Sequence, residues 1–502
     1  MTDSLWVKTT ELPSYPPLRE EIRADVAVIG GGMAGILTAT FLAKAGLHPV
    51  VLEAEQVGSG QTKNTTAKIT SQHGLLYAHL IEQFGEDLAQ QYAHANQQAV
   101  SQYRTLIAEQ DIDCAFTLSP AYLYSTLAEE PLVQEAQAAR RLGIDASFTR
   151  HTELPFSVRA ALRFDGQGHF HPLHFLKALL SSLEIYEHTP VLSIDQNQLV
   201  TPHGIVNAEA VVFACHYPFI NSPGYYFIRM HQERSYVLAL ENAGNMEGMY
   251  LGIDESGLSF RPYGTYLLLG GGSHRSGENT AGGRYERLRR LAQQYWPKSR
   301  EVAAWSAQDC MTLDGIPYIG PFSSSTPNWY VATGFQKWGM TSSMVAAQLL
   351  TDQILGRKNP DAAVFSPQRF KPSASAKMLI EETAHATTGL TKTFFDTPRT
   401  ELETLPIGHG GIVEYNGQKA GIYKDEKGEI FVVSVKCPHL GCQLEWNPDE
   451  KSWDCPCHGS RFDYKEIFWI IQHKRIFRTD NFQPRCKSGT SNRPYCSRVT
   501  RL

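Results

Sequence analysis

Four of the nine cysteines in this 502-residue chain lie close to two histidines within residues 437–458. The spacing is C-x-H at Cys437 and His439 and C-x-x-H at Cys455 and His458. Two thiolate sulfurs and two imidazole nitrogens can coordinate one zinc ion tetrahedrally. In a reducing compartment, clustered cysteines bind metal more often than they form structural disulfides. The segment therefore predicts a metal centre, with zinc as the simplest occupant.

Two further cysteines, Cys442 and Cys457, lie beside these ligand loops and have no role in a zinc site. The boxes CPHLGC and CPCHGSRF closely resemble those of the Rieske [2Fe–2S] family. The resemblance implies a small all-β domain with a disulfide between Cys442 and Cys457. It also implies two sulfur ligands on one iron, Cys437 and Cys455, and two nitrogen ligands on the other, His439 and His458. We therefore favour a Rieske cluster over zinc.

The residues around the predicted cluster bear on its reduction potential. Neutral imidazole ligands in place of two thiolates lower the negative charge on the cluster and raise its potential. The resemblance matches Ser460 to a hydroxyl that hydrogen-bonds a bridging sulfide in high-potential members, whereas Phe462 stands where those members have a tyrosine. One hydrogen bond to sulfur is therefore expected to be missing. We predict a potential in the lower half of the family's span, below about +200 mV.

A dinucleotide-binding fingerprint occupies the beginning of the chain. An apolar strand at residues 26–29 leads into a glycine cluster and a helix, and a second apolar strand ends on Glu53. Gly30, Gly32 and Gly35 take the G-x-G-x-x-G positions, which allow a tight turn, close approach of a pyrophosphate and close helix packing. Glu53 follows at the spacing of the acid that accepts hydrogen bonds from a ribose. The pattern predicts a Rossmann-like unit but does not distinguish NAD from FAD.

Three later stretches resemble FAD-dependent oxidoreductases of the D-amino-acid oxidase and glycine oxidase superfamily. They are the Gly- and Thr-rich loop at residues 56–70, the segment at 304–321 with its D-G-x-P-x-I-G box, and the A-T-G segment within 329–356. The resemblance implies FAD, a mixed α/β (α+β) Rossmann-like cofactor domain and an antiparallel sheet that forms the substrate cavity. The residues that it matches to flavin-lining positions are Gly58, Gly60, Thr62, Thr66, Asp314, Gly334, Gly339 and Met340.

A second nucleotide site for NADH is not expected. The other glycine-rich candidate, at residues 267–277, has Arg275 where the third glycine belongs and no helix pattern after it. The reductant is therefore expected to be an organic substrate that meets the flavin directly. The family's usual chemistry is hydride transfer from a carbon that bears an amine.

One departure from the family concerns the substrate. Glycine-oxidase-like members hold the substrate carboxylate with an arginine where this chain has Asp309. A carboxylate at that position repels a carboxylate and can hold an ammonium group, which favours an amine or polyamine-like substrate unless Arg234 or Arg261 provides a clamp from another strand. The candidates to line the cavity are Asp309, Arg261, Tyr236, His216 and Trp338. The last four are equally compatible with a structural role.

The two resemblances divide the chain into domains. An oxidoreductase domain is predicted at residues 1–360, a linker rich in Pro, Ser and Ala at 361–400, and a Rieske domain at 401–465. After Lys465 the Rieske pattern stops, and residues 466–502 contain eight Lys and Arg against two acids. We favour a shifted reading frame over a basic interaction tail as the origin of this end.

Composition excludes several partner classes. Hydrophobic residues make up 42% of the chain, charged residues 19%, and the net charge is −5, which gives no reason to expect nucleic acid or an anionic membrane surface. The first twenty residues lack the features of a secretory signal, and no apolar run is long enough to span a bilayer. A cytoplasmic location is expected.

Flavin and cluster together predict a route for electrons. A flavin accepts two electrons as a hydride and releases them singly, whereas the cluster carries one at a time. We therefore predict an FAD-dependent oxidoreductase that oxidises an amine or amino-acid-like substrate and exports electrons through the cluster to an unidentified acceptor. The alternative is a non-catalytic flavin and iron–sulfur redox sensor or assembly factor. A Rieske oxygenase is disfavoured because no catalytic iron domain follows the cluster.

Overall fold

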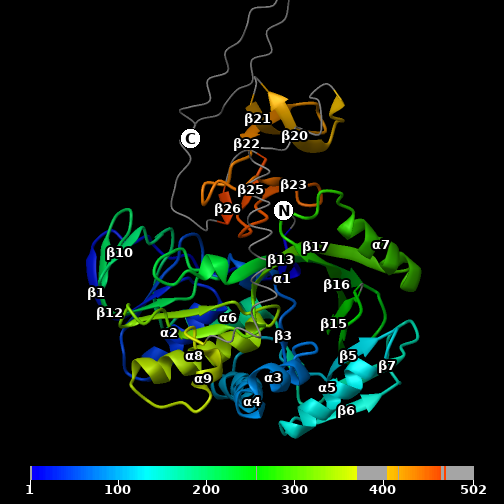
Figure 1. The fold of residues 1–502 in the computed structure, drawn as a ribbon, viewed down its shortest axis with the longest axis horizontal. Helices are drawn as coiled ribbons and strands as arrows, with labels where there is room; N and C mark the ends of the chain where they lie inside the picture. The colour runs from blue at the N-terminus through cyan, green and yellow to red at the C-terminus, as the bar shows by residue number, and fades with distance from the viewer. Residues whose placement is uncertain (1–2, 256, 370–403, 416–417, 465–467, 471–502) are drawn as a thin grey trace, which may run out of the picture. The chain divides into compact units, whose positions relative to one another are not determined.

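The computed structural model describes residues 3–255, 257–369, 404–415, 418–464 and 468–470 (Figure 1). The chain divides into two compact units. One is formed by Met1–Arg275 with Gly283–Ala384, and the other by Ser276–Gly282 with His385–Leu502. Most of the predicted linker, and the predicted tail apart from residues 468–470, lie outside the described residues, as do Cys486 and Cys496.

A mixed sheet forms the cofactor side of the first unit. Strand β1 is central and pairs in parallel with β2 on one side and β12 on the other. The strands are, in order, β10 (Ser193–Asp195), β11 (Gln198–Val200), β12 (Ile205–Phe213), β1 (Glu21–Ile29), β2 (Pro49–Leu52) and β9 (Glu184–Tyr186), with β19 (Trp329–Thr333) beside β12 and β18 (Tyr318–Pro321) beside β19. The last four residues of β1 and all of β2 are buried, as expected of parallel strands covered on both faces.

Helices pack around this sheet. Helix α2 (Met33–Lys44) follows β1 and packs against α8 (Gly339–Ile354). The other helices of the unit are α1 (Leu5–Thr9), α3 (Tyr77–Phe84), α4 (Glu86–Glu109), α5 (Glu130–Arg141), α6 (Pro172–Leu180), α7 (Arg284–Tyr295) and α9 (Ala362–Phe365), with 3-10 turns η1 (Gln61–Asn64) and η2 (Tyr226–Ile228). The helical pattern of residues 77–109 forms two helices because Gly85 takes a φ of 85°, which ends α3.

A second large sheet, mostly antiparallel, forms the other side of the first unit. Its order is β17 (Arg300–Thr312), β13 (Met230–Glu241), β16 (Tyr266–Arg275), β15 (Ser259–Tyr263), β14 (Met249–Gly252), β5 (Ala121–Ser125), β7 (Ala160–Phe164) and β6 (Ala146–Thr149). One face, with Trp305, Val237 and Leu268, belongs to the core that contains α2 and α8. The opposite face, with Tyr236 and Leu269, belongs to a separate core that contains residues of α7. We call the first of these the inner face.

A small three-stranded sheet completes the first unit. It consists of β3 (Lys68–Ile69), β8 (Gly168–His169) and β4 (Thr117–Leu118), with β8 in the middle. Strand β3 directly follows the predicted flavin-lining loop. Thr70, just after β3, exchanges hydrogen bonds with Thr341 in the first turn of α8. The loop and the start of α8 are therefore held together.

The second unit contains two antiparallel sheets. One is β20 (His409–Tyr415), β21 (Gln418–Lys424) and β22 (Ile430–Ser434); the other is β23 (Glu445–Asn447), β24 (Ser452–Asp454), β25 (Arg461–Asp463) and β26 (Phe468–Ile470). Trp446, Trp453 and Tyr423 lie in its core. The fold class expected from the sequence, a mixed α/β oxidoreductase with a small all-β domain, is confirmed. Among the described residues, no helix combines the length and apolar character that a membrane crossing requires.

Candidate functional site

The glycine fingerprint lies at the carboxyl end of β1, the edge where α/β sheets bind nucleotides. A Cβ atom placed on Gly35 would lie 1.9 Å from the carbonyl oxygen of Gly30. A side chain at this position would therefore push α2 away from the strand. Gly32 is the N-cap of α2 and makes no side-chain capping bond, so the first turn of the helix faces the loop with backbone amides.

Two side chains fix the loop around these amides. The Thr62 hydroxyl accepts a hydrogen bond from the Met33 amide at 3.0 Å. The Glu53 carboxylate accepts from the amides of Gly31 at 2.6 Å and Glu55 at 2.9 Å. Burial raises the pKa of Glu53, while these amide bonds oppose the rise. The amide-lined turn with an acid at the end of β2 fits the pyrophosphate and ribose of FAD.

The other predicted flavin-lining residues lie at two places. Gly58 packs against Leu176, Gly60 is the N-cap of η1 with open space beside it, and Thr66 is half-buried in the same loop. Gly339 is the first residue of α8, also beside open space, and Met340 is buried behind it. The loop and the start of α8 thus leave room where a ring system would bind.

Gly334 and Asp314 have packing partners within the protein. A Cβ on Gly334 would meet Thr312, so the backbone approaches β17 closely there. Asp314 is buried and forms a bidentate ion pair with Arg369, with both nitrogen–oxygen distances 2.8 Å. Arg369 holds the pKa of Asp314 below its ordinary value, although burial acts against this. The Asp314 carboxylate is therefore occupied by this ion pair.

Asp309 lies on the inner face of the second sheet, at alternate positions from Trp305 on β17 and directly opposite Glu233 on β13. The Trp305 indole donates to the Asn64 carbonyl at 2.8 Å, and the Gln308 amide donates to the Gln61 side chain. These bonds join the strand to the predicted flavin-lining loop. Asp309 therefore lies on the face that would meet a flavin.

The charges around Asp309 are unevenly distributed. Glu233 forms an ion pair with Lys337 at 2.9 Å and accepts a hydrogen bond from the Ser273 hydroxyl at 3.1 Å. Within the described residues, the Asp309 carboxyl forms neither an ion pair nor a hydrogen bond. Burial raises the pKa of Asp309 to about 7; Lys337 and Arg234 act against the rise and Glu233 adds to it. Asp309 is partly accessible to solvent.

Tyr236 and Arg234 lie on the other face of the second sheet. The Tyr236 hydroxyl is 3.1 Å from Nε2 of His274, and its ring packs edge-on against Tyr285 of α7. Arg234 donates to the hydroxyl of Ser306 at 3.0 Å. Both residues therefore lie on the face opposite Asp309, and the Arg234 guanidinium is held by the Ser306 and Gln308 side chains.

Trp338 and His216 lie close to the end of β19 and the start of α8; the His216 carbonyl accepts a hydrogen bond from the Thr333 hydroxyl. Trp338 precedes α8 and stacks on His73, with ring centroids 4.7 Å apart. His73 is itself fixed by the Tyr92 hydroxyl at 2.6 Å and by the Thr70 carbonyl at 2.7 Å. His216 follows β12 and is partly accessible; burial lowers its pKa to about 4.

Arg261 lies on the inner face beside a lysine that the sequence analysis did not single out. Lys68 Nζ donates to the Ser259 hydroxyl at 2.7 Å and to the Tyr250 carbonyl at 3.2 Å. Arg261 follows Ser259 by two residues on β15 and therefore shares its face. The sequence offered one sign of this residue: Lys68 is a lysine in the strand directly after the predicted flavin-lining loop. Its partners could not be predicted because they are far away in the sequence.

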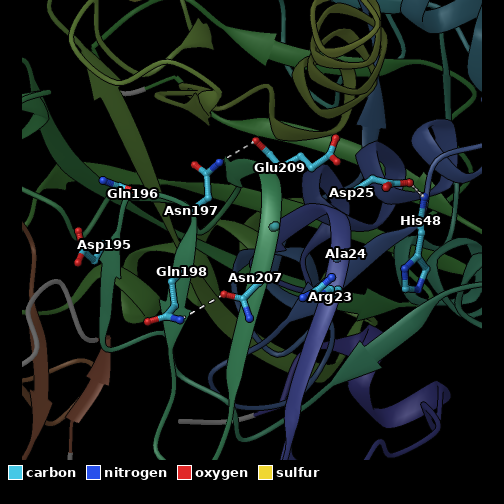
Figure 2. A pocket seen from close by; sticks show the side chains of 11 residues that line it. Arg23, Ala24, Asp25, His48, Asp195, Gln196, Asn197, Gln198, Asn207 and Glu209 are labelled. Atoms are coloured by element: carbon cyan, nitrogen blue, oxygen red, sulfur yellow. Dashed lines mark hydrogen bonds between the residues drawn. The ribbon is translucent and has the colours of Figure 1, made fainter.

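A hollow of about 710 Å³ lies at a different edge of the first sheet (Figure 2). Its lining includes Arg23 and Asp25 near the start of β1, and His48, which precedes β2. This is the amino-terminal edge of the parallel strands, opposite the edge where α/β sheets bind their ligands. We do not assign the catalytic site to it.

In the second unit, the four predicted cluster ligands lie on two loops. The Nδ1 atoms of His439 and His458 are 3.1 Å apart, so both rings face one point. The thiols of Cys437 and Cys455 share a hydrogen bond, which lowers the pKa of Cys437 and raises that of Cys455. Two imidazoles and two thiols on facing loops fit the donor set of a Rieske cluster.

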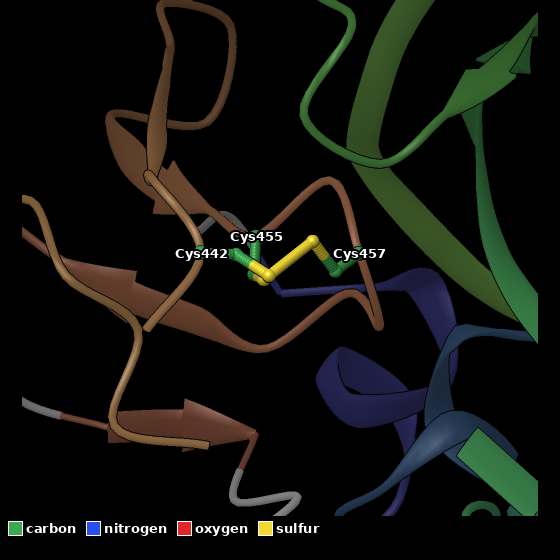
Figure 3. Close-up of side chains that lie close together, drawn as sticks. All are labelled: Cys442, Cys455 and Cys457. Atoms are coloured by element: carbon green, nitrogen blue, oxygen red, sulfur yellow. A yellow bond between two sulfur atoms is a disulfide. The ribbon is translucent and has the colours of Figure 1, made fainter. Parts of the chain in front are cut away.

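The remaining two cysteines of these loops, Cys442 and Cys457, form a disulfide (Figure 3). Their sulfurs and that of Cys455 lie within 4.8 Å of one another, but disulfide sulfurs are not thiolates and do not make a three-cysteine metal site. Ser460 also hydrogen-bonds Cys437, and the buried ring of Phe462 brings no hydroxyl. The disulfide expected from the sequence is confirmed.

Comparison with known families decides what binds at these sites. Residues 25–353 match the family model described as FAD dependent oxidoreductase, and residues 400–469 match the Rieske [2Fe-2S] domain. The chain belongs to the FAD-dependent oxidoreductase family and carries a C-terminal Rieske domain. FAD and a [2Fe–2S] cluster are therefore its cofactors, and zinc is excluded as the metal of the second unit.

Individual relatives agree with this assignment. The oxidoreductase is 40% identical over 479 residues to YhfW of Bacillus subtilis, named as a Rieske 2Fe-2S iron-sulfur protein, with 92% of this chain and 94% of that protein covered. It is 26% identical over 215 residues to gamma-glutamylputrescine oxidoreductase of Escherichia coli, which covers 40% of this chain and 50% of that protein. Its fold resembles glycine oxidase from Geobacillus kaustophilus, with a TM-score of 0.59, 21% identity and coverage of 69% and 99%.

Proposed function

We propose that this FAD-dependent oxidoreductase oxidises the C–N bond of an amine or amino-acid-like small molecule and passes the electrons to its Rieske cluster and then to an external acceptor. When bound, FAD provides two-electron acceptance from the substrate carbon and the cluster provides one-electron transfer. Amine chemistry is supported by the names of its relatives, glycine oxidase and gamma-glutamylputrescine oxidoreductase.

The observation that carries the proposal is the position of Asp309 on the inner face. Its carboxyl group forms no ion pair within the described residues, while the neighbouring Glu233 is already paired with Lys337. A carboxylate in this position attracts a protonated amine, and a group whose pKa lies near 7 can accept a proton from that amine at neutral pH. We assign Asp309 the role of holding the ammonium group and taking up its proton.

Anaerobic bleaching of the flavin tests the proposal. The purified protein is mixed without oxygen with a panel of primary amines, diamines and amino acids, and the flavin and cluster absorbances are followed together. Loss of the flavin absorbance followed by cluster reduction is expected with at least one amine. If no amine or amino acid bleaches the flavin while dithionite reduces both centres, the protein is not an amine oxidoreductase and a sensor role is favoured.

The variant Asp309→Asn sharpens this test. The amide keeps the size of the side chain but cannot accept the proton, so flavin reduction by the active amine should slow by at least about tenfold. Its pH profile should also lose the inflection near pH 7 that the wild-type Asp309 provides. Equal rates and equal pH profiles for the two proteins would remove Asp309 from the mechanism.

A further inference from the structure

The segment that precedes the first strand of the cofactor sheet lies against the flavin-lining loop. We call residues 4–18, which include α1 and the extended chain after it, the N-terminal strap. Helix α1 contacts η1 of the loop, β17 and α6. Neither the glycine fingerprint nor the proposed amine chemistry uses this segment, so its contacts with the loop need another explanation.

Trp6 joins the strap to the end of the loop. Its indole nitrogen donates to the Thr65 carbonyl at 2.7 Å, next to the Asn64 carbonyl that accepts from the other indole at 2.8 Å. Two tryptophans, one from α1 and one from β17, therefore hold two successive carbonyls of the same loop. The Trp6 ring is fully buried and packs edge-on against Trp305, with the centroids 6.5 Å apart, so neither indole can turn away freely.

Glu187 joins the strap to the beginning of the loop. This buried carboxylate, just after β9, accepts from the Val57 amide at 2.8 Å with one oxygen and from the Tyr15 amide at 3.0 Å with the other. Between these two bonds, the strap packs on the loop directly. A Cβ atom on Gly58 would lie 3.1 Å from a methyl carbon of Leu12. The strap therefore meets the loop at both of its ends.

The loop is poorly suited to keep its shape without such support. Gly58 and Gly60 give its backbone a freedom that is lost when a ligand orders it. Ala67, at the end of the loop, has a φ of 54°, which costs free energy in alanine and persists where the surroundings impose it. The bond from Trp6 is made two residues before this alanine. A loop that is ordered beforehand binds its ligand more tightly, because less entropy is lost on binding.

We propose that the N-terminal strap is a positioning element of the FAD site, which keeps the flavin-lining loop in the shape that receives the cofactor. Trp6 and Glu187 are its positioning residues, and they act through the backbone of the loop rather than by touching FAD. This role depends on FAD being the cofactor, which the family match shows, and not on which substrate is oxidised. Retention of FAD therefore depends on residues that lie outside the dinucleotide fingerprint.

Release of FAD from the holoprotein tests this role without any substrate. The holoprotein is diluted, and the rise of free-flavin fluorescence gives the release rate and the dissociation constant. Trp6→Phe keeps an aromatic ring but removes the indole N–H, so both quantities should rise by at least about fivefold. Trp329→Phe is the matched control, because the Trp329 indole donates to the Gln196 carbonyl at 2.9 Å at the amino-terminal edge of the cofactor sheet. This control should release FAD at the wild-type rate.

A second pair of variants preserves the size of the side chain. Glu187→Gln keeps one acceptor oxygen but turns a donor toward one of the two amides, so FAD release should accelerate by at least about threefold. Glu135→Gln is its control. Glu135 is also a buried carboxylate that accepts from backbone amides, but its partners, Leu76, Tyr77 and Ala78, are at the start of α3. Both variants should lose stability, whereas FAD release should change only in Glu187→Gln.

Far-ultraviolet circular dichroism, recorded during FAD release, separates positioning from general support of the fold. FAD should leave Trp6→Phe while the dichroism stays constant. Release that coincides with loss of the dichroism would overturn the proposal, because the strap would then support the whole unit. Wild-type release rates in both Trp6→Phe and Glu187→Gln, or equal acceleration in these variants and their controls, would also overturn it. If Trp6→Phe does not accumulate as a folded holoprotein, Glu187→Gln and its control decide.

Discussion

Within the described part of the chain, each unit buries one arginine completely, and the two arginines have opposite surroundings. Arg461 in the Rieske unit donates to Asp454 at 2.7 and 3.2 Å and to Glu450 at 2.9 Å. Arg261 in the oxidoreductase unit donates to one backbone carbonyl. A buried charge with matched carboxylates is part of the framework, whereas a buried charge without them destabilises the fold that contains it.

Removing Arg461 should have the largest effect. Arg461→Met leaves Asp454 and Glu450 buried without their cation, and breaking such a pair costs about 3–5 kcal/mol of unfolding free energy. Urea unfolding monitored by cluster absorbance measures the loss. Stability equal to that of the wild type would show that this ion-pair network is not structural.

Arg261→Met should act in the opposite direction. No carboxylate loses its partner, and replacing an uncompensated buried charge by an apolar side chain is neutral or stabilising by about 1–3 kcal/mol. Unfolding of the oxidoreductase unit, followed by flavin fluorescence, measures the change. A loss as large as that in Arg461→Met would mean that Arg261 has a structural role and would end the contrast between the two residues.

Asp309→Asn should change stability by a smaller amount and only at higher pH. The folded-state pKa of Asp309 is about 7, above the ordinary value of 3.8, so the folded state holds the proton more tightly than the unfolded state. The stability of the folded state is therefore not reduced by Asp309 below pH 4, and it falls as pH rises from about 4 to about 7. Asp309→Asn should therefore be more stable than the wild type above pH 7, by on the order of 1–2 kcal/mol after allowance for partial exposure. A difference that does not depend on pH would contradict this.

An exposed ion pair gives the smallest expected effect and calibrates the others. Arg141 and Glu86 are both more than half exposed at their side chains. Arg141→Met should change the unfolding free energy by less than about 1 kcal/mol, because surface pairs are screened by solvent. A larger loss would show that methionine is disruptive in itself and that the buried substitutions need another replacement.

Local motifs predicted the cofactors well. The spacing from Gly30 to Glu53 indicated a dinucleotide, and the Cys and His spacing around Cys437 and Cys455 indicated a metal centre. FAD and the [2Fe–2S] cluster themselves were expected from the family resemblances. The fold class followed from the same stretches. Apolar spacing continues through Gly85, so spacing alone does not show the helix end that its positive φ produces.

Contacts between residues that are far apart in the sequence determine the rest of the candidate site. Tyr236 was a candidate cavity residue, but strand alternation places it toward α7. Asp314 was matched to a cofactor position, but its carboxylate is paired with Arg369, fifty-five residues later. Lys68 was not singled out because Ser259 and Arg261 approach it from a distant strand. A single sequence gives composition and spacing but not the register that determines such neighbours.

The alternation along β17 separates two tasks that evolution can change independently. Trp305, Ala307 and Asp309 lie on the inner face, while Ser306 and Gln308 lie on the opposite face and accept hydrogen bonds from Arg234 in the layer beneath. Substitution at the odd-numbered positions can therefore alter which molecules are accepted without disturbing that layer. Insertion or deletion of one residue exchanges the two sets at once, so we expect homologues to vary this strand by replacement and to keep its length.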